Sequence, residues 1–262
     1  MRVNLTRERL AKGETVFGCG LQVYRSAEIC RAFAAAGFDY VFIDMEHGSY
    51  DLETVQDMIK VSLDSGITPI VRVAELLYSL VCRLLDAGAQ GIILPRVEDP
   101  KVLEEAVGWM RFPPVGTRGY GVNPTMIGYE VRSFPEIIEH LNLNTVSVVQ
   151  FETVTAMERA DELLSVRGTD IAMVGPADLS ISLGIPGQFD HPLLVSTVDR
   201  LIEKCVKHHV VPGIQTRSTA MAKFWAERGM RFVGASAEHG LLLEKARETV
   251  AVLQATKTAS RA

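Results

Sequence analysis

Residues 68–98 read TPIVRVAELLYSLVCRLLDAGAQGIILPRVE, and this stretch decides the fold. An apolar, β-branched run at 68–73 predicts a buried strand, and a second such run follows at 91–97. Between them, residues 77–87 carry apolar side chains at helical spacing and are followed by Gly88, a residue type that commonly ends helices. The stretch therefore predicts two parallel strands joined by a crossover helix.

The same unit repeats about eight times along the 262 residues. The predicted strands lie at 16–23, 40–46, 68–73, 91–97, 146–152, 170–175, 211–216 and 231–236. The predicted helices lie at 26–36, 52–65, 77–87, 99–111, 154–166, 192–209, 218–229 and 240–255. Eight units in a chain of this length are typical of a single-domain (β/α)8 TIM barrel. A doubly wound open sheet is the alternative, but it would normally have fewer strands or a longer chain.

One insertion interrupts the repeat at residues 113–144. It begins PPVGTRGYGVNP, rich in glycine and proline, and includes a short helical piece around 134–142. A long glycine-rich excursion of this kind is usually a lid or a contact between subunits. No linker or low-complexity tract marks a domain boundary, so we expect one domain over residues 1–262.

The composition excludes several classes of protein. The formal net charge is -5, which argues against nucleic-acid binding and against binding to anionic membranes. Every long apolar stretch is interrupted well short of the roughly 20 residues of a bilayer span. The polar N-terminus does not resemble a signal peptide, and the four cysteines form no CxxC pair, which favours reduced thiols. We therefore expect a cytoplasmic protein.

Polar side chains follow most of the predicted strands. Because the active sites of these barrels lie at the carboxyl ends of the strands, we expect these side chains to converge at one mouth. They are Asp44, Glu46, His47, Arg72, Arg96, Gln150, Glu152, Asp178, Gln215, Arg217 and Ser236.

Glu152 and Asp178 are the candidate ligands for a divalent cation. Carboxylate oxygens without nearby thiolates suit Mg²⁺ or Mn²⁺. Each residue alone could equally be a helix cap, since Asp178 directly precedes an apolar run. On adjacent strand ends, the pair favours metal binding.

Arg72 and His47 are the candidate catalytic groups. The planar guanidinium of Arg72 suits a carboxylate or phosphate, although it could instead form a structural ion pair with Glu46 or Asp44. A histidine beside carboxylates, as His47 is, suits proton transfer near neutral pH, and a surface loop histidine is the alternative. The spacing alone predicts that Asp86 is a solvated helix residue.

Two absences limit the chemistry. A Schiff-base aldolase needs a lysine that projects from a strand into the barrel. All lysines lie on predicted helices or near the termini: Lys12, Lys60, Lys101, Lys204, Lys207, Lys223, Lys245 and Lys257. The chain also lacks a P-loop and a GxGxxG motif after a strand, which argues against a nucleotide cofactor.

Six motifs in order along the chain resemble the HpcH/HpaI aldolase family. They are IDMEH (43–47), IVRV (70–73), LLDAGAQGIILPRVE (84–98), RFPPVGTRG (111–119), VVQFET (148–153) and GPADLS (175–180). The resemblance implies a metal-dependent, class II aldolase that cleaves 4-hydroxy-2-oxo acids to pyruvate and an aldehyde. It also implies a homohexamer of (β/α)8 barrels whose last helix is exchanged between subunits.

The resemblance also assigns roles to individual residues. It implies that Glu152 and Asp178 bind Mg²⁺, Mn²⁺ or Co²⁺, that Glu46 supports a metal-bound water, and that Asp178 also contributes to substrate binding. It implies that Gln150 and the backbone of Ala177 contact pyruvate. By the same resemblance, Arg72 binds the substrate and stabilises an enolate oxygen, and His47 transfers protons. Asp86 then raises the basicity of that histidine, in its own or a neighbouring subunit.

The chain departs from the family pattern at a few positions, and two other functions stay open. Met45 replaces a Gly, Thr or Tyr, while Arg96, Gln215–Arg217 and residues 235–240 lie in variable segments that would face the aldehyde or another subunit. One alternative function is a Mg²⁺-dependent lyase acting on a CoA thioester or a phosphoenolpyruvate-type substrate. The other is a non-catalytic barrel that binds small acids.

Overall fold

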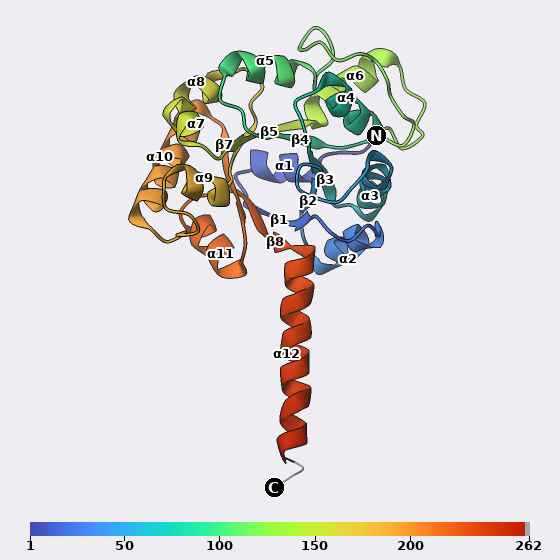
Figure 1. Cartoon of the computed structure of the whole chain (residues 1–262). Helices are drawn as coiled ribbons and strands as arrows, with labels where there is room; N and C mark the ends of the chain where they lie inside the picture. The colour runs from blue at the N-terminus through green and yellow to red at the C-terminus, as the bar shows by residue number, and fades with distance from the viewer. Residues whose placement is uncertain (260–262) are drawn as a thin grey trace.

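The computed structural model describes residues 1–259 and contains a closed barrel of eight strands (Figure 1). The strands are β1 (Val16–Leu21), β2 (Tyr40–Asp44), β3 (Thr68–Arg72), β4 (Gly91–Leu94), β5 (Val146–Phe151), β6 (Ile171–Val174), β7 (Val211–Thr216) and β8 (Phe232–Ala237). Each strand pairs in parallel with the next, and β8 pairs with β1. The predicted (β/α)8 barrel is confirmed, whereas an open sheet is wrong. Residues 260–262 of the expected domain lie outside the described residues.

Twelve helices are found within residues 1–259. They are α1 (Leu5–Ala11), α2 (Glu28–Ala36), α3 (Leu52–Ser65), α4 (Tyr78–Ala87), α5 (Pro100–Gly108), α6 (Phe134–Asn144), α7 (Val154–Glu158), α8 (Ala160–Ser165), α9 (Pro176–Ser182), α10 (Pro192–His208), α11 (Thr219–Glu227) and α12 (Glu238–Ala259). The sequence did not predict α1 or α9, and the helix expected at 154–166 divides at Arg159 into α7 and α8. Seven-residue helices such as α1 and α9 span only two turns, too few for helical periodicity to be recognised.

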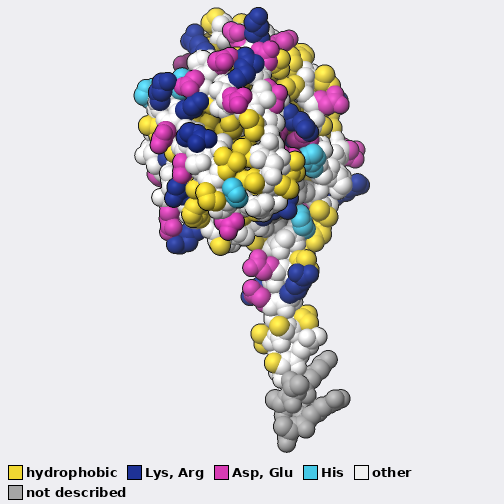
Figure 2. Space-filling model, turned by 60° about the vertical axis from the view of Figure 1, so that its left-hand side comes forward, with side chains coloured by type: hydrophobic (Ala, Val, Ile, Leu, Met, Phe, Trp, Pro, Cys, Tyr) yellow, Lys and Arg dark blue, Asp and Glu magenta, His cyan; other side chains and the backbone are white. Residues whose placement is uncertain are grey.

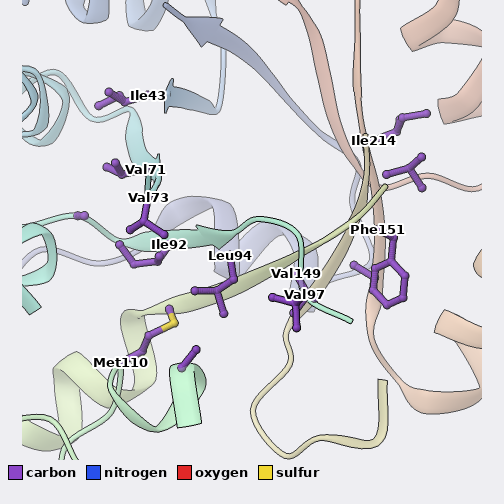
Figure 3. Packing of buried hydrophobic residues seen from close by; sticks show 14 of the residues in the cluster. Ile43, Val71, Val73, Ile92, Leu94, Val97, Met110, Val149, Phe151 and Ile214 are labelled. Carbon is purple, nitrogen blue, oxygen red and sulfur yellow. The ribbon is translucent and has the colours of Figure 1, made fainter. Parts of the chain in front are cut away.

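The two faces of the sheet have separate cores because successive strand residues point to opposite sides. Inside the barrel, residues from all eight strands pack against one another and against Leu10 of α1, which covers the amino-terminal end of the strands. Outside, the other residues pack against the surrounding helices, as Figure 3 shows for Ile43, Val71 and Ile92. Residues that share the inward register with Phe42 and Ile70 therefore reach the barrel axis, and Asp44 and Arg72 are next in that register.

The insertion at 113–144 forms no second sheet. It wraps α6 against a small cluster of its own, in which Phe112, Met126, Ile137 and Leu141 are buried. Ser133 and Glu136 form a capping box at the start of α6. The insertion lies beside α4 and α5 (Figure 1), and none of its residues lines the cavity at the carboxyl ends of the strands.

The last helix, α12, leaves the barrel and projects away from it (Figures 1 and 2). Its described side chains include several exposed apolar ones: Leu242, Leu243, Val250, Val252 and Leu253. The final helix of a (β/α)8 barrel normally belongs to the ring of helices that covers the outside of the sheet.

Within residues 1–259, no helix combines the length and apolar character needed to cross a bilayer. All four cysteines are buried and free, as the sequence predicts.

Candidate active site

A cavity of about 410 Å³ opens at the carboxyl ends of the strands. Its lining combines the inward ends of the strands with the loops that follow them: Gln22, Asp44, His47, Arg72, Gln150, Ala177, Asp178, Gln215, Arg217, Ser236 and His239 line it, among others. Eight of the eleven polar side chains predicted from strand ends therefore meet at one mouth, namely Asp44, His47, Arg72, Gln150, Asp178, Gln215, Arg217 and Ser236. Glu46, Arg96 and Glu152 are not among the residues that line it.

Arg72 is fixed from three sides at the end of β3. Its Nε and Nη2 donate hydrogen bonds to the two oxygens of Asp44 over 2.9 and 2.6 Å. Its Nη1 lies 3.1 Å from Glu46 Oε2 and 3.4 Å from Gln150 Oε1. The ion pairs that the sequence offered as an alternative are thus present, and Arg72 nonetheless lines the cavity. A bidentate pair of this kind holds the guanidinium in one orientation.

Asp44 organises the loop after β2, a role that the sequence did not predict. Besides Arg72, it accepts hydrogen bonds from the backbone N–H groups of Glu46 and His47 and from Gln22 Nε2. Burial would raise the pKa of Asp44, but its hydrogen bonds and the charge of Arg72 outweigh burial and lower it. The carboxylate is therefore ionised and holds Glu46 and His47 at the rim. Its inward register, two residues after Phe42, is the signal that identifies it.

Glu152 is buried just after β5, with 5% of its surface exposed. Its Oε1 accepts the backbone N–H of Arg96 over 2.9 Å, and its Oε2 accepts Gln150 Nε2 over 2.5 Å. Burial raises the pKa of Glu152, and the charges of Asp178 and Glu46 raise it further. Glu152 therefore lies close enough to Asp178 and to Glu46 for each of their charges to act on it. A Cβ at Gly175 would meet the Glu152 side chain at 3.1 Å, so only glycine fits there easily.

Asp178 lies in the first turn of α9 and faces the cavity. Among the described residues its carboxylate makes no hydrogen bond or ion pair, so the alternative role of helix cap is not observed. The first intrahelical bond of α9 runs from Leu179 N–H to the Gly175 carbonyl. The N–H of Ala177 precedes that bond and has no intrahelical acceptor.

Glu46, Glu152 and Asp178 offer only oxygen ligands, which fits Mg²⁺ or Mn²⁺. Glu46 Oε2 is buried and forms the ion pair with Arg72, but it accepts no hydrogen bond of regular geometry within the described part of the chain. Residues 1–259 contain no preformed cluster of three or more His, Cys, Asp or Glu with metal-site geometry. A metal bound here would therefore have few protein ligands and would complete its shell with water or substrate oxygens, as Mg²⁺ commonly does.

His47 and Asp86 are not brought together within one chain. His47 is exposed at the rim of the cavity. Asp86, at the end of α4, is half-buried and accepts a 2.7 Å hydrogen bond from Arg118 Nη2 of the insertion. Burial raises the pKa of Asp86, although Arg118 opposes that shift. The expectation of a solvated helix residue at Asp86 is therefore wrong, and its pairing with His47 stays a prediction for a neighbouring subunit.

The wall formed by β7 and β8 carries polar groups without partners. Gln215 Nε2 donates to the Ser236 carbonyl over 2.9 Å, which leaves the buried Gln215 Oε1 without a donor among residues 1–259. Ser236 adopts a left-handed backbone conformation, with φ of 65°. Arg217 has no carboxylate partner in the described chain and lies 6.0 Å from the Phe189 ring centroid. Arg96 and Met45 do not line the cavity; Arg96 contributes its backbone N–H to Glu152.

Glu238 links the loop after the first strand to the start of the last helix, and the sequence did not predict this role. Its buried Oε1 accepts the successive backbone N–H groups of Gln22, Val23 and Tyr24 over 2.5–3.1 Å. Burial would raise the pKa of Glu238, but these hydrogen bonds outweigh it and the pKa is lowered. The contact ties the loop after β1 to the start of α12 at the rim of the cavity.

The chain is similar to known aldolases along nearly its whole length. Residues 23–244 match the family model described as HpcH/HpaI aldolase/citrate lyase. The hydroxypyruvate/pyruvate aldolase of Roseobacter denitrificans is 33% identical over 257 residues, which cover 95% of this chain and 96% of the relative. The 4-hydroxy-2-oxo-heptane-1,7-dioate aldolase of Escherichia coli is 31% identical over 92% of this chain and 90% of its own length. The crystal structure of an HpcH/HpaI aldolase from Desulfitobacterium hafniense superposes with a TM-score of 0.90 at 29% identity, covering 95% and 96% of the two chains.

Proposed function

The chain belongs to the HpcH/HpaI aldolase/citrate lyase family, and from this premise we propose that it is a divalent-metal-dependent aldolase. Its reaction would be the reversible cleavage of a 4-hydroxy-2-oxo acid to pyruvate and an aldehyde. The observation that carries the proposal is the fixed Arg72 guanidinium in a cavity that Asp178 also lines, with Glu46 Oε2 3.1 Å from Arg72 Nη1.

Glu152 and Asp178 would hold the metal, and Glu46 would accept a hydrogen bond from a water bound to it. The bound ion would act as a Lewis acid that stabilises negative charge on the 2-oxo oxygen of pyruvate. Mg²⁺, Mn²⁺ and Co²⁺ are the candidate ions. The acidic surroundings of Glu152 support this role, since Asp178 and Glu46 raise its pKa and a dication would offset their charges where a neutral ligand would not.

Arg72 would stabilise the enolate oxygen that develops when a proton leaves the pyruvate methyl group. Because Asp44 holds its Nε and Nη2, the guanidinium does not have to reorient as charge appears, and such preorganised donors are effective electrostatic catalysts. Gln150 and the N–H of Ala177 line the same cavity, with hydrogen-bonding groups suited to a carboxylate or keto oxygen. They would orient pyruvate beside Arg72.

His47 would transfer the proton. Its backbone N–H is fixed to Asp44 Oδ1 over 3.2 Å, while its side chain is exposed at the cavity rim. In the cleavage direction, the same general base would accept the proton of the C4 hydroxyl group. Asp86 of a neighbouring subunit would then orient the imidazole and favour its protonated form.

We also propose that α12 is exchanged between subunits of a hexamer. An isolated helix with this many exposed apolar side chains is unfavourable, and on the barrel Phe17 of β1 and Phe224 of α11 are each 42% exposed. The insertion exposes a second set of apolar side chains, Tyr129, Val131 and Phe134. Covering both surfaces with neighbouring copies would bury them without changing the fold of the barrel.

Exchange of the pyruvate methyl protons for deuterium tests the proposed metal, the enolate and the general base together. It does not require that the aldehyde be known. Pyruvate is incubated with the enzyme and Mn²⁺ or Mg²⁺ in D₂O, and loss of the methyl proton signal is followed by NMR. We expect exchange that stops with excess chelator and resumes when the metal is restored. Exchange that continues in chelator would refute the metal role, and binding of pyruvate without exchange would favour a non-catalytic acid-binding barrel.

A further inference from the structure

We propose that the amino-terminal end of the barrel, here called the closed end because it lies opposite the active-site cavity, contains a second binding site. This site is specific for a compact oxyanion with two or more negative charges. A cavity of about 530 Å³ lies there between the C-terminal half of α1 and the amino-terminal ends of β5 to β8. The charged or titratable side chains in its lining are Arg7, Lys12, Asp170, His209 and Arg231. The proposal is independent of the aldolase reaction, because no residue is shared with the catalytic cavity.

The lining carries more positive charge than its own carboxylate can neutralise. Three cations, Arg7, Lys12 and Arg231, face one acid, Asp170. Within residues 1–259, neither Lys12 nor Arg231 has an ion-pair partner, and the Arg231 guanidinium donates only to the Leu10 carbonyl, over 3.3 Å. A chain with a net charge of -5 therefore concentrates cations at this point.

Asp170 does not neutralise Lys12 or Arg231, because its oxygens already pair with two other arginines. Its Oδ1 lies 3.0 Å from Arg7 Nη1, and its Oδ2 lies 2.9 Å from Arg111 Nη2. Oδ2 also accepts the backbone N–H of Ser147 over 2.9 Å. Arg111 adds a further cation behind the lining, and its buried Nη1 has no hydrogen-bond partner in the described part of the chain. One carboxylate therefore serves two arginines, and the remaining charge is uncompensated.

The chemistry of the lining indicates the ligand class. Guanidinium groups bind phosphate, sulfate and carboxylate oxygens through paired N–H donors, and an ammonium group adds a point charge. The cavity has a volume in the range of small-molecule sites. Its remaining wall is apolar, formed by Leu10, Val146, Ile171 and Val211, and would contact a short carbon skeleton. Phosphate monoesters and polycarboxylates share these features.

The site is separated from the catalytic mouth by the inner core of the barrel. Phe42, Ile70, Val148 and Phe232 fill that core between the two ends. An anion at the closed end would therefore bind without contact with the proposed metal ligands, and its binding can be measured in the metal-loaded enzyme.

Sulfate is the probe, because it is a tetrahedral dianion that does not titrate near neutral pH. Isothermal titration of the full chain with sodium sulfate, at ionic strength matched with NaCl, should show saturable binding. Lys12→Ala, which removes an exposed side chain without partners, should weaken it at least tenfold, as should Arg231→Gln. Lys223→Ala, on the exposed face of α11, is the matched control and should leave affinity unchanged. Circular dichroism checks the folding of Arg231→Gln, since that residue also contacts α1.

Glycerol phosphate and tricarballylate then distinguish the two candidate ligand classes, phosphate monoesters and polycarboxylates. Each is titrated in competition with sulfate, and the tighter ligand identifies phosphate monoesters or polycarboxylates as the class preferred. The proposal is overturned if wild-type protein shows no sulfate binding beyond that of chloride, or if Lys12→Ala binds as wild type does. Loss of binding in Arg217→Gln instead would place sulfate at the catalytic mouth and would also overturn it.

Discussion

Replacing Asp44 by asparagine should both destabilise the protein and disorganise its active site. Asp44 is fully buried and accepts five hydrogen bonds, two of them from Arg72. The amide would present an N–H₂ group to donors on one side and would leave the Arg72 guanidinium with Glu46 as its one remaining carboxylate partner among the described residues. Breaking a buried ion pair by removing one partner costs about 3–5 kcal/mol. For a chain of this size, that corresponds to a fall in Tm of roughly 6–20 °C.

A double-mutant cycle separates this pair from general damage to the core. Asp44→Asn, Arg72→Met and the double variant are compared by differential scanning fluorimetry and by urea unfolding. The double variant should lose much less stability than the sum of the losses in the two single variants. In it, the Asp44 carboxylate and the Arg72 guanidinium are removed together, so neither is left buried without the other. A fall in Tm of under 2 °C for Asp44→Asn, or strict additivity in the cycle, would refute the reasoning.

The same pair predicts a pH dependence with a definite sign. The pKa of Asp44 is lower in the folded protein than in an unfolded chain, so the carboxylate stabilises the fold above its unfolded pKa of about 3.9. That stabilisation is lost as the pH falls through the lower folded value. The difference in Tm between wild type and Asp44→Asn should therefore be constant from pH 5 to 8 and should shrink below about pH 4. A difference that grows on acidification would contradict the assignment.

Four further outcomes are expected. Glu152→Gln should reduce aldol cleavage at least 100-fold with saturating Mn²⁺, because an amide is a weaker ligand than a carboxylate; undiminished activity would exclude it as a metal ligand. His47→Asn should slow methyl proton exchange of pyruvate about 10²–10⁴-fold while pyruvate still binds, and unchanged exchange would remove it from the mechanism. Arg217→Ala should raise KM for aldehydes that bear a carboxylate more than for neutral ones, measured as paired KM values. Deleting residues 246–262 should convert the assembly to smaller species in sedimentation analysis, and an unchanged mass would contradict helix exchange.

The sequence predicts the barrel because each strand is marked by its own apolar, β-branched run. A long helix is also recognisable, because its apolar residues recur at helical spacing over several turns. The helix at 52–65 was predicted at its observed bounds, since Asp51 caps its start and Gly66 ends it in the left-handed conformation. The strand predicted at 16–23 ends earlier, at Leu21, because Gln22 and Val23 instead donate their N–H groups to Glu238. Boundaries set by contacts this distant in the chain carry no local signal.

The sequence predicts which residues meet at the mouth of the barrel, but it does not predict which of them contact one another. Residues of one inward register converge wherever a parallel barrel closes, so Arg72, Gln150 and Gln215 could be placed together from the strands alone. Pairing within the mouth depends on side-chain geometry across strands, as in the two hydrogen bonds between Arg72 and Asp44. The partner of Asp86 was not predictable either, because Arg118 comes from an insertion whose path follows no repeat.

The balance of charge supports the proposed need for a cation when the anionic substrate binds. Asp44, Glu46, Glu152 and Asp178 are four carboxylates at or beside the mouth, against the two guanidinium groups of Arg72 and Arg217. Pyruvate is itself an anion, and two like charges 4 Å apart at a protein surface repel by about 4 kcal/mol. A dication between substrate and carboxylates reverses the sign of that interaction. Neutralising Glu152 alone would lessen the repulsion but would also remove a ligand, so substrate binding and metal binding should be lost together rather than separately.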